Sequence, residues 1–282
     1  MKIIIIYNIK TTREILMKTL LCLSILCVCS TSFAHEPFVA PLAYTTENTQ
    51  IPVIAGYAEQ ALQPEYALKD VQLTVIQPQQ TQVTLDAQAL KSMSSFHLPL
   101  PEQGTYTLYT KTSYPIQYVK HQQQWKIYAD VPAEQAPAIT ERDYVIASDF
   151  NGKLPKKVET VREWTLQTYL SKGSPSAVAN TTAPIQISFN THPNQLVAQQ
   201  SIQLQLKKDN LAFTTAQVTI RAQGVTETQA QDIAVQPDGT ARFSFPHAGQ
   251  YLVEVTEKID PQAMPKNQNY TIISLQVAPP KS

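Results

Sequence analysis

Two short stretches with the same pattern, PEQGTY at residues 101–106 and PHAGQY at residues 246–251, indicate how this chain folds. In both, proline, glycine and tyrosine have the spacing P-x-x-G-x-Y, and a phenylalanine stands shortly before them, at Phe96 and Phe243. A glycine two residues before a strand-starting tyrosine is typical of the tyrosine corner of immunoglobulin-like sandwiches, in which the ring packs inside and the hydroxyl bonds to the chain just upstream. Two copies predict two sandwiches, although G-x-Y before a strand also occurs in other β proteins.

Apolar and polar residues alternate in several segments, which is the pattern of half-buried antiparallel strands. The alternating segments are VQLTV, IQLQL, RFSF, YLVEV and ISLQV, at residues 71–75, 202–206, 242–245, 251–255 and 273–277. Residues 156–172 fit a helix about as well as a strand, and we favour a strand because the neighbouring segments are strands. The predicted fold class is all-β, with two tandem immunoglobulin-like antiparallel β-sandwich domains after a cleaved signal peptide.

The beginning of the chain has the features of a secretory leader. Lys18 precedes the apolar run TLLCLSILCV, which is shorter than the roughly 20 residues of a membrane-spanning helix, and the small-x-small pattern Ser32-Phe33-Ala34 follows. Cleavage there would leave His35 as the first residue, with Met17 as the natural start codon. We therefore expect an exported, periplasmic protein.

All three cysteines, Cys22, Cys27 and Cys29, lie in that leader. The mature chain would then have no thiol and no disulfide, and a packed core must hold it together. A lipid anchor on Cys29 is the alternative, but Val28 just before it fits such a signal poorly.

The predicted division of the chain follows from the leader and the repeat. Residues 1–34 are the upstream extension and signal peptide, residues 35–175 the first sandwich, and residues 176–282 the second. The segment SKGSPSAVANTTAP, residues 171–184, is the expected linker.

The charge balance excludes several partners. The chain has 22 lysines and arginines and 22 aspartates and glutamates, which predicts no strongly basic surface for nucleic acid or anionic lipid. No second apolar run reaches spanning length, so we expect no stable membrane insertion of the mature chain.

Common catalytic motifs are missing after residue 34: there is no G-x-S-x-G, no H-E-x-x-H, no phosphate-binding loop and no cysteine pair. We therefore expect a protein that is not an enzyme. A chain-starting histidine, however, offers an α-amine with a pKa of about 7.7 and an imidazole, two nitrogen ligands that favour copper(II), nickel(II) or zinc. The predicted site holds one such transition-metal ion through His35, with Glu36, His97 and His192 as candidate further ligands.

Plainer interpretations of the polar residues stay open. The later histidines also fit solvated side chains near turns. Asp143, Asp149 and Asn151 have oxygen ligands that suit calcium, but their spacing misses the EF-hand pattern. Tyr57 and Tyr66 could line a groove for a glycan or peptide, or belong to the core.

A family resemblance covers nearly all of the predicted mature chain. It is carried by HEPFVAPLAYTTENTQIPVIAGYAEQ, PEYALKD, ETVREWTLQTYLSKGSPS, SFNTHPNQLVAQQSIQLQL and HAGQYLVEV. These segments resemble domain of unknown function 4198, a family of exported bacterial proteins once labelled as nickel-uptake subunits. The resemblance implies an exported all-β protein with a loose link to metal acquisition and no settled activity. Phe38 departs from the tryptophan that is common there in the family.

Two functions are therefore open. The first is an exported, non-enzymatic protein that binds a transition metal through His35 or assists nickel, cobalt, copper or zinc uptake. The second is an envelope module that binds a glycan or a protein partner, such as an outer-membrane receptor or transporter, without any metal.

Overall fold

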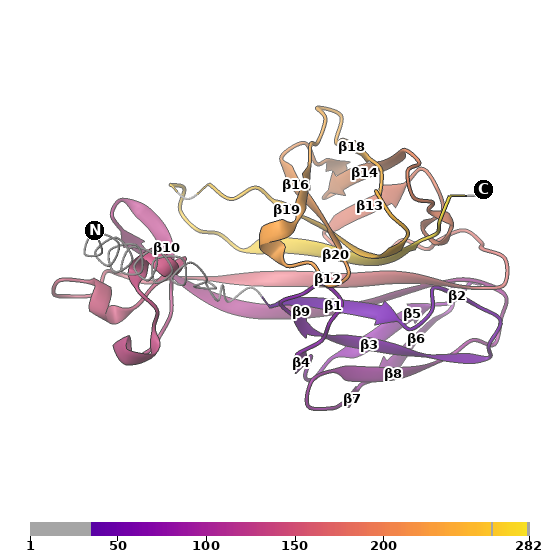
Figure 1. Ribbon diagram of the computed structural model, residues 1–282, viewed down its shortest axis with the longest axis horizontal. Coiled ribbons are helices and arrows are strands. Elements are labelled where there is room, and N and C mark those ends of the chain that lie inside the picture. The colour runs from indigo at the N-terminus through magenta and orange to yellow at the C-terminus, as the bar shows by residue number, and fades with distance from the viewer. Residues whose placement is uncertain (1–34, 261, 281–282) are drawn as a thin grey trace, which may run out of the picture.

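The computed structural model describes residues 35–260 and 262–280, which form strands joined by loops and single-turn 3-10 helices (Figure 1). The predicted leader and its cysteines lie outside the described residues. Within them, no helix has the length and apolar character needed to cross a membrane. The prediction of an all-β fold is confirmed.

The first half of the described chain forms two sheets that face each other across a hydrophobic core. One sheet has the order β1 (Glu36–Pro41), β3 (Gln50–Ala58), β8 (Ser94–Pro99) and β7 (Gln88–Ala89), with β4 (Tyr66–Ala67) paired to β3. The facing strands are β6 (Gln82–Asp86), β5 (Gln72–Ile76), β9 (Gly104–His121) and β12 (Val158–Lys172), with β2 (Thr45–Thr46) beside the end of β12.

The second half repeats this order. One sheet holds β13 (Ile185–Phe189), β14 (Ile202–Lys208), β15 (Leu211–Ala212) and β18 (Thr240–Phe243). The facing strands are β17 (Gln231–Ile233), β16 (Ala216–Ala222), β19 (Gly249–Glu257) and β20 (Gln268–Val277). In both halves, therefore, two layers of strands face each other as in a sandwich, while the count of two tandem domains stays a prediction.

Both predicted tyrosine corners are present. The Tyr106 hydroxyl donates to the Glu102 carbonyl at 2.9 Å and accepts from the Glu102 N–H at 2.9 Å. The Tyr251 hydroxyl donates to the His247 carbonyl at 2.9 Å. Gly104 has φ +120° and Gly249 has φ +149°, a region that residues with a side chain rarely adopt, so the motif needs glycine at this position.

Strand β12 joins the two halves. Along one edge it pairs antiparallel with β9, from Val158 opposite Tyr118 to Lys172 opposite Gly104. Along the other edge it pairs parallel with β20. Residues 158–172 are therefore a strand, as favoured from the sequence, and in the described part of the chain they fuse the facing sheets of both halves into one sheet of 11 strands.

The two cores lie on opposite faces of this fused sheet. In Figure 1, β13, β14 and β18 lie above the long strands, and β3 and β8 lie below them. Successive side chains of a strand point to opposite faces. On β20, Ile272 belongs to the first core and Ile273 to the second, and on β19 Leu252 and Val253 divide in the same way. The first core therefore contains side chains from the second half, and the second core contains Tyr169 of β12 from the first half.

The predicted linker lies against the fused sheet. After β12, the Ser176 N–H donates to the Thr105 hydroxyl at 2.9 Å and the Ala179 N–H donates to the Thr107 hydroxyl at 3.1 Å. Ala179 and Ala183 are buried. The segment therefore covers part of β9, while the division of the chain at residues 175 and 176 stays a prediction.

An arm projects from the sandwiches at the left of Figure 1, and the sequence patterns did not predict it. The far ends of β9 and β12 carry β10 (Gln124–Tyr128), β11 (Tyr144–Val145), η1 (Ala133–Gln135), η2 (Ile139–Glu141) and η3 (Ala147–Asp149). Val119, Tyr128 and Val145 form a small core of its own at this end.

Replacing Tyr106 or Tyr251 by phenylalanine tests the corners. Each change removes a hydroxyl with little change in volume, and we expect the free energy of unfolding to fall by about 1–2 kcal/mol. Tyr106→Phe should cost more than Tyr251→Phe, because its hydroxyl has both a donor and an acceptor partner. Urea denaturation measures both; a loss under about 0.3 kcal/mol for either would contradict a stabilising corner.

Cutting the chain at the predicted boundary tests the shared cores. A fragment of residues 35–175 lacks Leu252, Tyr270 and Ile272, which belong to the first core. We expect this fragment to lack fixed tertiary structure and the intact mature chain to unfold in one cooperative step. Proton–nitrogen NMR spectra of the fragment and calorimetry of the whole chain measure this. A well-dispersed fragment spectrum would show that the first half folds alone.

Candidate functional site at the start of β1

His35 stands directly before β1 and contacts residues near β4. Its Nε2 lies 3.0 Å from the Glu65 Oε2, and its ring meets the Tyr66 ring edge-on, with 5.1 Å between centroids. The Glu65 Oε1 accepts the backbone N–H of Glu59 at 3.0 Å. The antiparallel pairing of Tyr57 with Tyr66 places the segment that contains Glu65 beside the end of β3. The Glu65 carboxylate is thus held at both oxygens.

This contact selects one tautomer of His35. The backbone hydrogen bond from Glu59, aided by His35 itself, lowers the pKa of the Glu65 carboxyl. An ionised carboxylate only accepts hydrogen bonds, so the hydrogen of the neutral imidazole is placed on Nε2. The Nδ1 lone pair then remains available, on a side chain that is 30% exposed.

Glu36, predicted as a ligand, forms an ion pair instead. Its carboxylate contacts the guanidinium of Arg221 on β16 in the second half. The Arg221 residue is only 3% exposed. Since a buried charge that loses its partner is costly, this carboxylate is committed to Arg221.

His192, another predicted ligand, has both ring nitrogens engaged. Its Nε2 lies 2.9 Å from the Ser176 carbonyl and 3.1 Å from the Thr105 hydroxyl, and its Nδ1 accepts the Asn194 N–H at 3.1 Å. Burial lowers its pKa, which favours the neutral ring. His192 therefore ties the segment after β12 to the sheet.

His97 is exposed on β8, far from His35. It pairs with Pro52, whereas Glu36 pairs with Ala58 at the other end of β3. At about 3.3 Å per residue, these ends lie on the order of 20 Å apart. Within residues 35–260 and 262–280, no three His, Cys, Asp or Glu side chains gather as a metal cluster. The structure thus does not bring the predicted ligands together.

Glu65 is the residue that the sequence analysis missed. It lies 30 positions after His35, and only the β3–β4 pairing brings the two together. No local spacing signals this contact.

Asp149, one of the calcium candidates, and Tyr57, one of the groove candidates, also have structural partners. The Asp149 carboxylate accepts from Arg142 at 2.6 Å and from the Ile146 N–H at 2.7 Å, and these bonds lower its pKa. The Tyr57 hydroxyl lies 3.3 Å from that of Thr112. The two hydrogen bonds of Asp149 therefore stabilise the arm.

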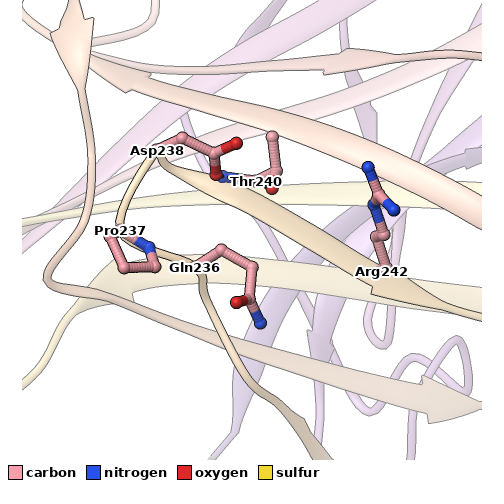
Figure 2. A pocket seen from close by; sticks show the side chains of 5 residues that line it. All are labelled: Gln236, Pro237, Asp238, Thr240 and Arg242. Atoms are coloured by element: carbon pink, nitrogen blue, oxygen red, sulfur yellow. Dashed lines mark hydrogen bonds between the residues drawn. The ribbon is translucent and has the colours of Figure 1, made fainter.

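A shallow surface pocket lies at the turn before β18. Figure 2 shows its lining side chains, Gln236, Pro237, Asp238, Thr240 and Arg242. The Asp238 carboxylate accepts from both the N–H and the hydroxyl of Thr240, so it closes the turn. This pocket is separate from the His35 site and contains no histidine.

Comparison with solved structures gives only distant similarity. A two-domain fibronectin type-III segment of chicken tenascin is 11% identical, with 86% of this chain and 99% of that chain covered and a TM-score of 0.22. A tetra-tandem repeat from the extending region of a large adhesion protein is 12% identical with a TM-score of 0.22; the match covers 86% of this chain and 49% of that chain, so this chain spans about half of it.

Comparison with known sequences gives one family. No curated protein matches the chain significantly. The family described as Domain of unknown function (DUF4198) matches residues 32–258, which include the His35 site and most of both sandwiches. The chain therefore belongs to the DUF4198 family, as the resemblance in its sequence implied.

Proposed function

We propose that the mature protein is an exported, periplasmic, non-enzymatic protein that binds one transition-metal ion through the α-amine and the Nδ1 of His35. The contact between the His35 Nε2 and Glu65 carries this proposal. A histidine that ligates a metal through one ring nitrogen almost always donates its other N–H to a carboxylate, carbonyl or water. In this site, the Glu65 carboxylate would be the group that accepts the hydrogen bond from the other ring nitrogen of His35.

The two nitrogen ligands favour a transition metal such as copper(II), nickel(II) or zinc. Amine and imidazole of one residue close a chelate ring, so assembling the first two ligands costs little entropy. Such nitrogen ligands bind copper(II) more tightly than nickel(II) or zinc in the general order of divalent metals. Water can supply the remaining ligands of the metal ion because the His35 side chain is 30% exposed. A role in metal uptake would then be delivery or sequestration outside the cytoplasm.

A second candidate function is docking on an envelope protein, such as an outer-membrane receptor or transporter. The projecting arm favours it. Ile139 of the arm and Tyr114 of β9, with 45% and 60% of their surface accessible, are large exposed groups of the kind that partner proteins cover.

Metal titration of the mature protein distinguishes these functions. Protein that begins at His35 is compared, by calorimetry with copper(II) and nickel(II), with a variant that carries one extra alanine before His35. We expect tight binding of one ion, weakened at least about 100-fold by the added alanine, because the extension converts the amine to an amide. Equal or absent binding in both proteins would reject the metal site and leave docking as the function.

Glu65 provides a second test. We expect Glu65→Ala to weaken metal binding by about 10–100-fold, the usual effect of losing an outer-shell carboxylate. Glu59→Ala is the matched control, since Glu59 contributes its backbone N–H and the substitution leaves that group in place. Equal affinities of all three proteins would show that Glu65 does not orient the imidazole.

A further inference from the structure

A group of charged and tyrosine side chains lies where the two halves meet, separate from the His35 nitrogens; Arg221, Glu254 and Tyr270 are its buried members. It is placed on the face of the fused sheet that points toward the first core. We call it the seam cluster, and its members are Glu36 of β1, Arg162 of β12, Arg221 of β16, Glu227 of η5 (Glu227–Gln229), Glu254 of β19, Tyr270 of β20 and the nearby Tyr118 of β9.

Strand register brings these side chains together. Arg221 pairs with Leu252, so Glu254, two residues further along β19, is its diagonal neighbour on the same face. The Arg221 guanidinium also contacts Glu36. On the other side of Glu254, the Arg162 guanidinium lies 6.0 Å from the centre of the Tyr270 ring.

Two loops, one from each half, are hydrogen-bonded to each other next to the seam cluster. The Ala61 N–H donates to the Val225 carbonyl at 3.0 Å, and the Gly224 N–H donates to the Ala61 carbonyl at 2.9 Å. Gln60 and Thr226 form a β-bridge between the same loops. Glu227 follows directly, so the loop that contacts the first half carries one of the cluster's carboxyl groups.

The cluster has more acids than bases. Among the described residues, the carboxyl groups of Glu36, Glu227 and Glu254 face the guanidinium groups of Arg162 and Arg221. A single protonated carboxyl would balance the charges. Glu254 is the carboxyl group that holds this proton, because burial, aided by the nearby Glu227 and opposed by Arg221, raises its pKa to about 7.

We propose that the seam cluster is a proton-responsive latch between the two halves, closed when Glu254 is protonated and loosened when Glu254 ionises. Ionisation leaves three carboxylates against two guanidinium groups, and the Glu254 carboxylate is itself buried. Repulsion from the ionised Glu254 pushes the exposed Glu227 outward, and residues 223–230 move with it away from residues 59–63.

The direction of the pH effect follows from linkage. Unfolded Glu254 titrates near 4.5 and the folded residue near 7, so folding favours the protonated form. Stability from this group is fully present below pH 4.5 and is lost as pH rises through 7. The latch therefore loosens toward alkaline pH.

Hydrogen exchange measures the latch without any added metal, so its result does not depend on the His35 site. In the wild type, we expect the protection factors of the Ala61 and Gly224 amides to fall at least about tenfold between pH 6 and pH 8, after correction for intrinsic exchange. In Glu254→Gln they should stay constant, because glutamine does not ionise.

Two further variants keep the test decisive. Glu227→Gln removes the carboxylate that the ionised Glu254 repels, so its fall in protection between pH 6 and pH 8 should be clearly smaller than that of the wild type, and this variant decides the question if Glu254→Gln does not fold. Glu163→Gln, an exposed change on β12, should behave as the wild type. Unchanged protection in the wild type, or the same fall in both cluster variants, would overturn the proposal.

Discussion

The parallel pairing of β12 with β20 is the constraint on which the rest of the structure depends. It places β12 between strands of both halves, so residues 164–172 are buried on both faces. Polar side chains there need partners inside the protein. The Thr168 hydroxyl donates to the Ser274 carbonyl at 3.1 Å, and the Ser171 hydroxyl lies 3.0 Å from that of Thr105. The same shared sheet gives each half a core that the other half completes.

This pairing also decides where the chain's first described residues lie. Strand β1 packs on the fused sheet, and the Ser274 hydroxyl donates to the Val39 carbonyl at 2.6 Å. The start of β1 then points toward the second half, where Glu36 meets Arg221. The His35 site and the seam cluster therefore occupy one region, although they use different side chains.

Local patterns explain what could be predicted from the sequence. The tyrosine corners involve residues four apart, and the alternating strands each bury one face, so both leave a signal in a short window. Residues 156–172 were ambiguous because a strand buried on both faces loses its alternation. The fused sheet, the arm and the contact of His35 with Glu65 depend on pairing between distant segments. The predicted ligands Glu36 and His192 had the right chemistry, but tertiary partners occupy them.

The ion pair of Glu36 with Arg221 restricts which ligands a metal ion at the neighbouring His35 could bind. A metal that drew the Glu36 carboxylate away would leave the 3% exposed Arg221 without its contact, and an unpaired buried charge costs several kcal/mol. Under the proposed function, an ion at His35 would therefore find nitrogen ligands and water, while Glu65 contacts the other ring nitrogen. Nitrogen and water without a carboxylate suit copper(II) or nickel(II) better than the oxygen-seeking calcium and magnesium. In the proposed metal site, the ion pair of Glu36 with the second half would thus influence metal selectivity, because it keeps a carboxylate ligand from the ion.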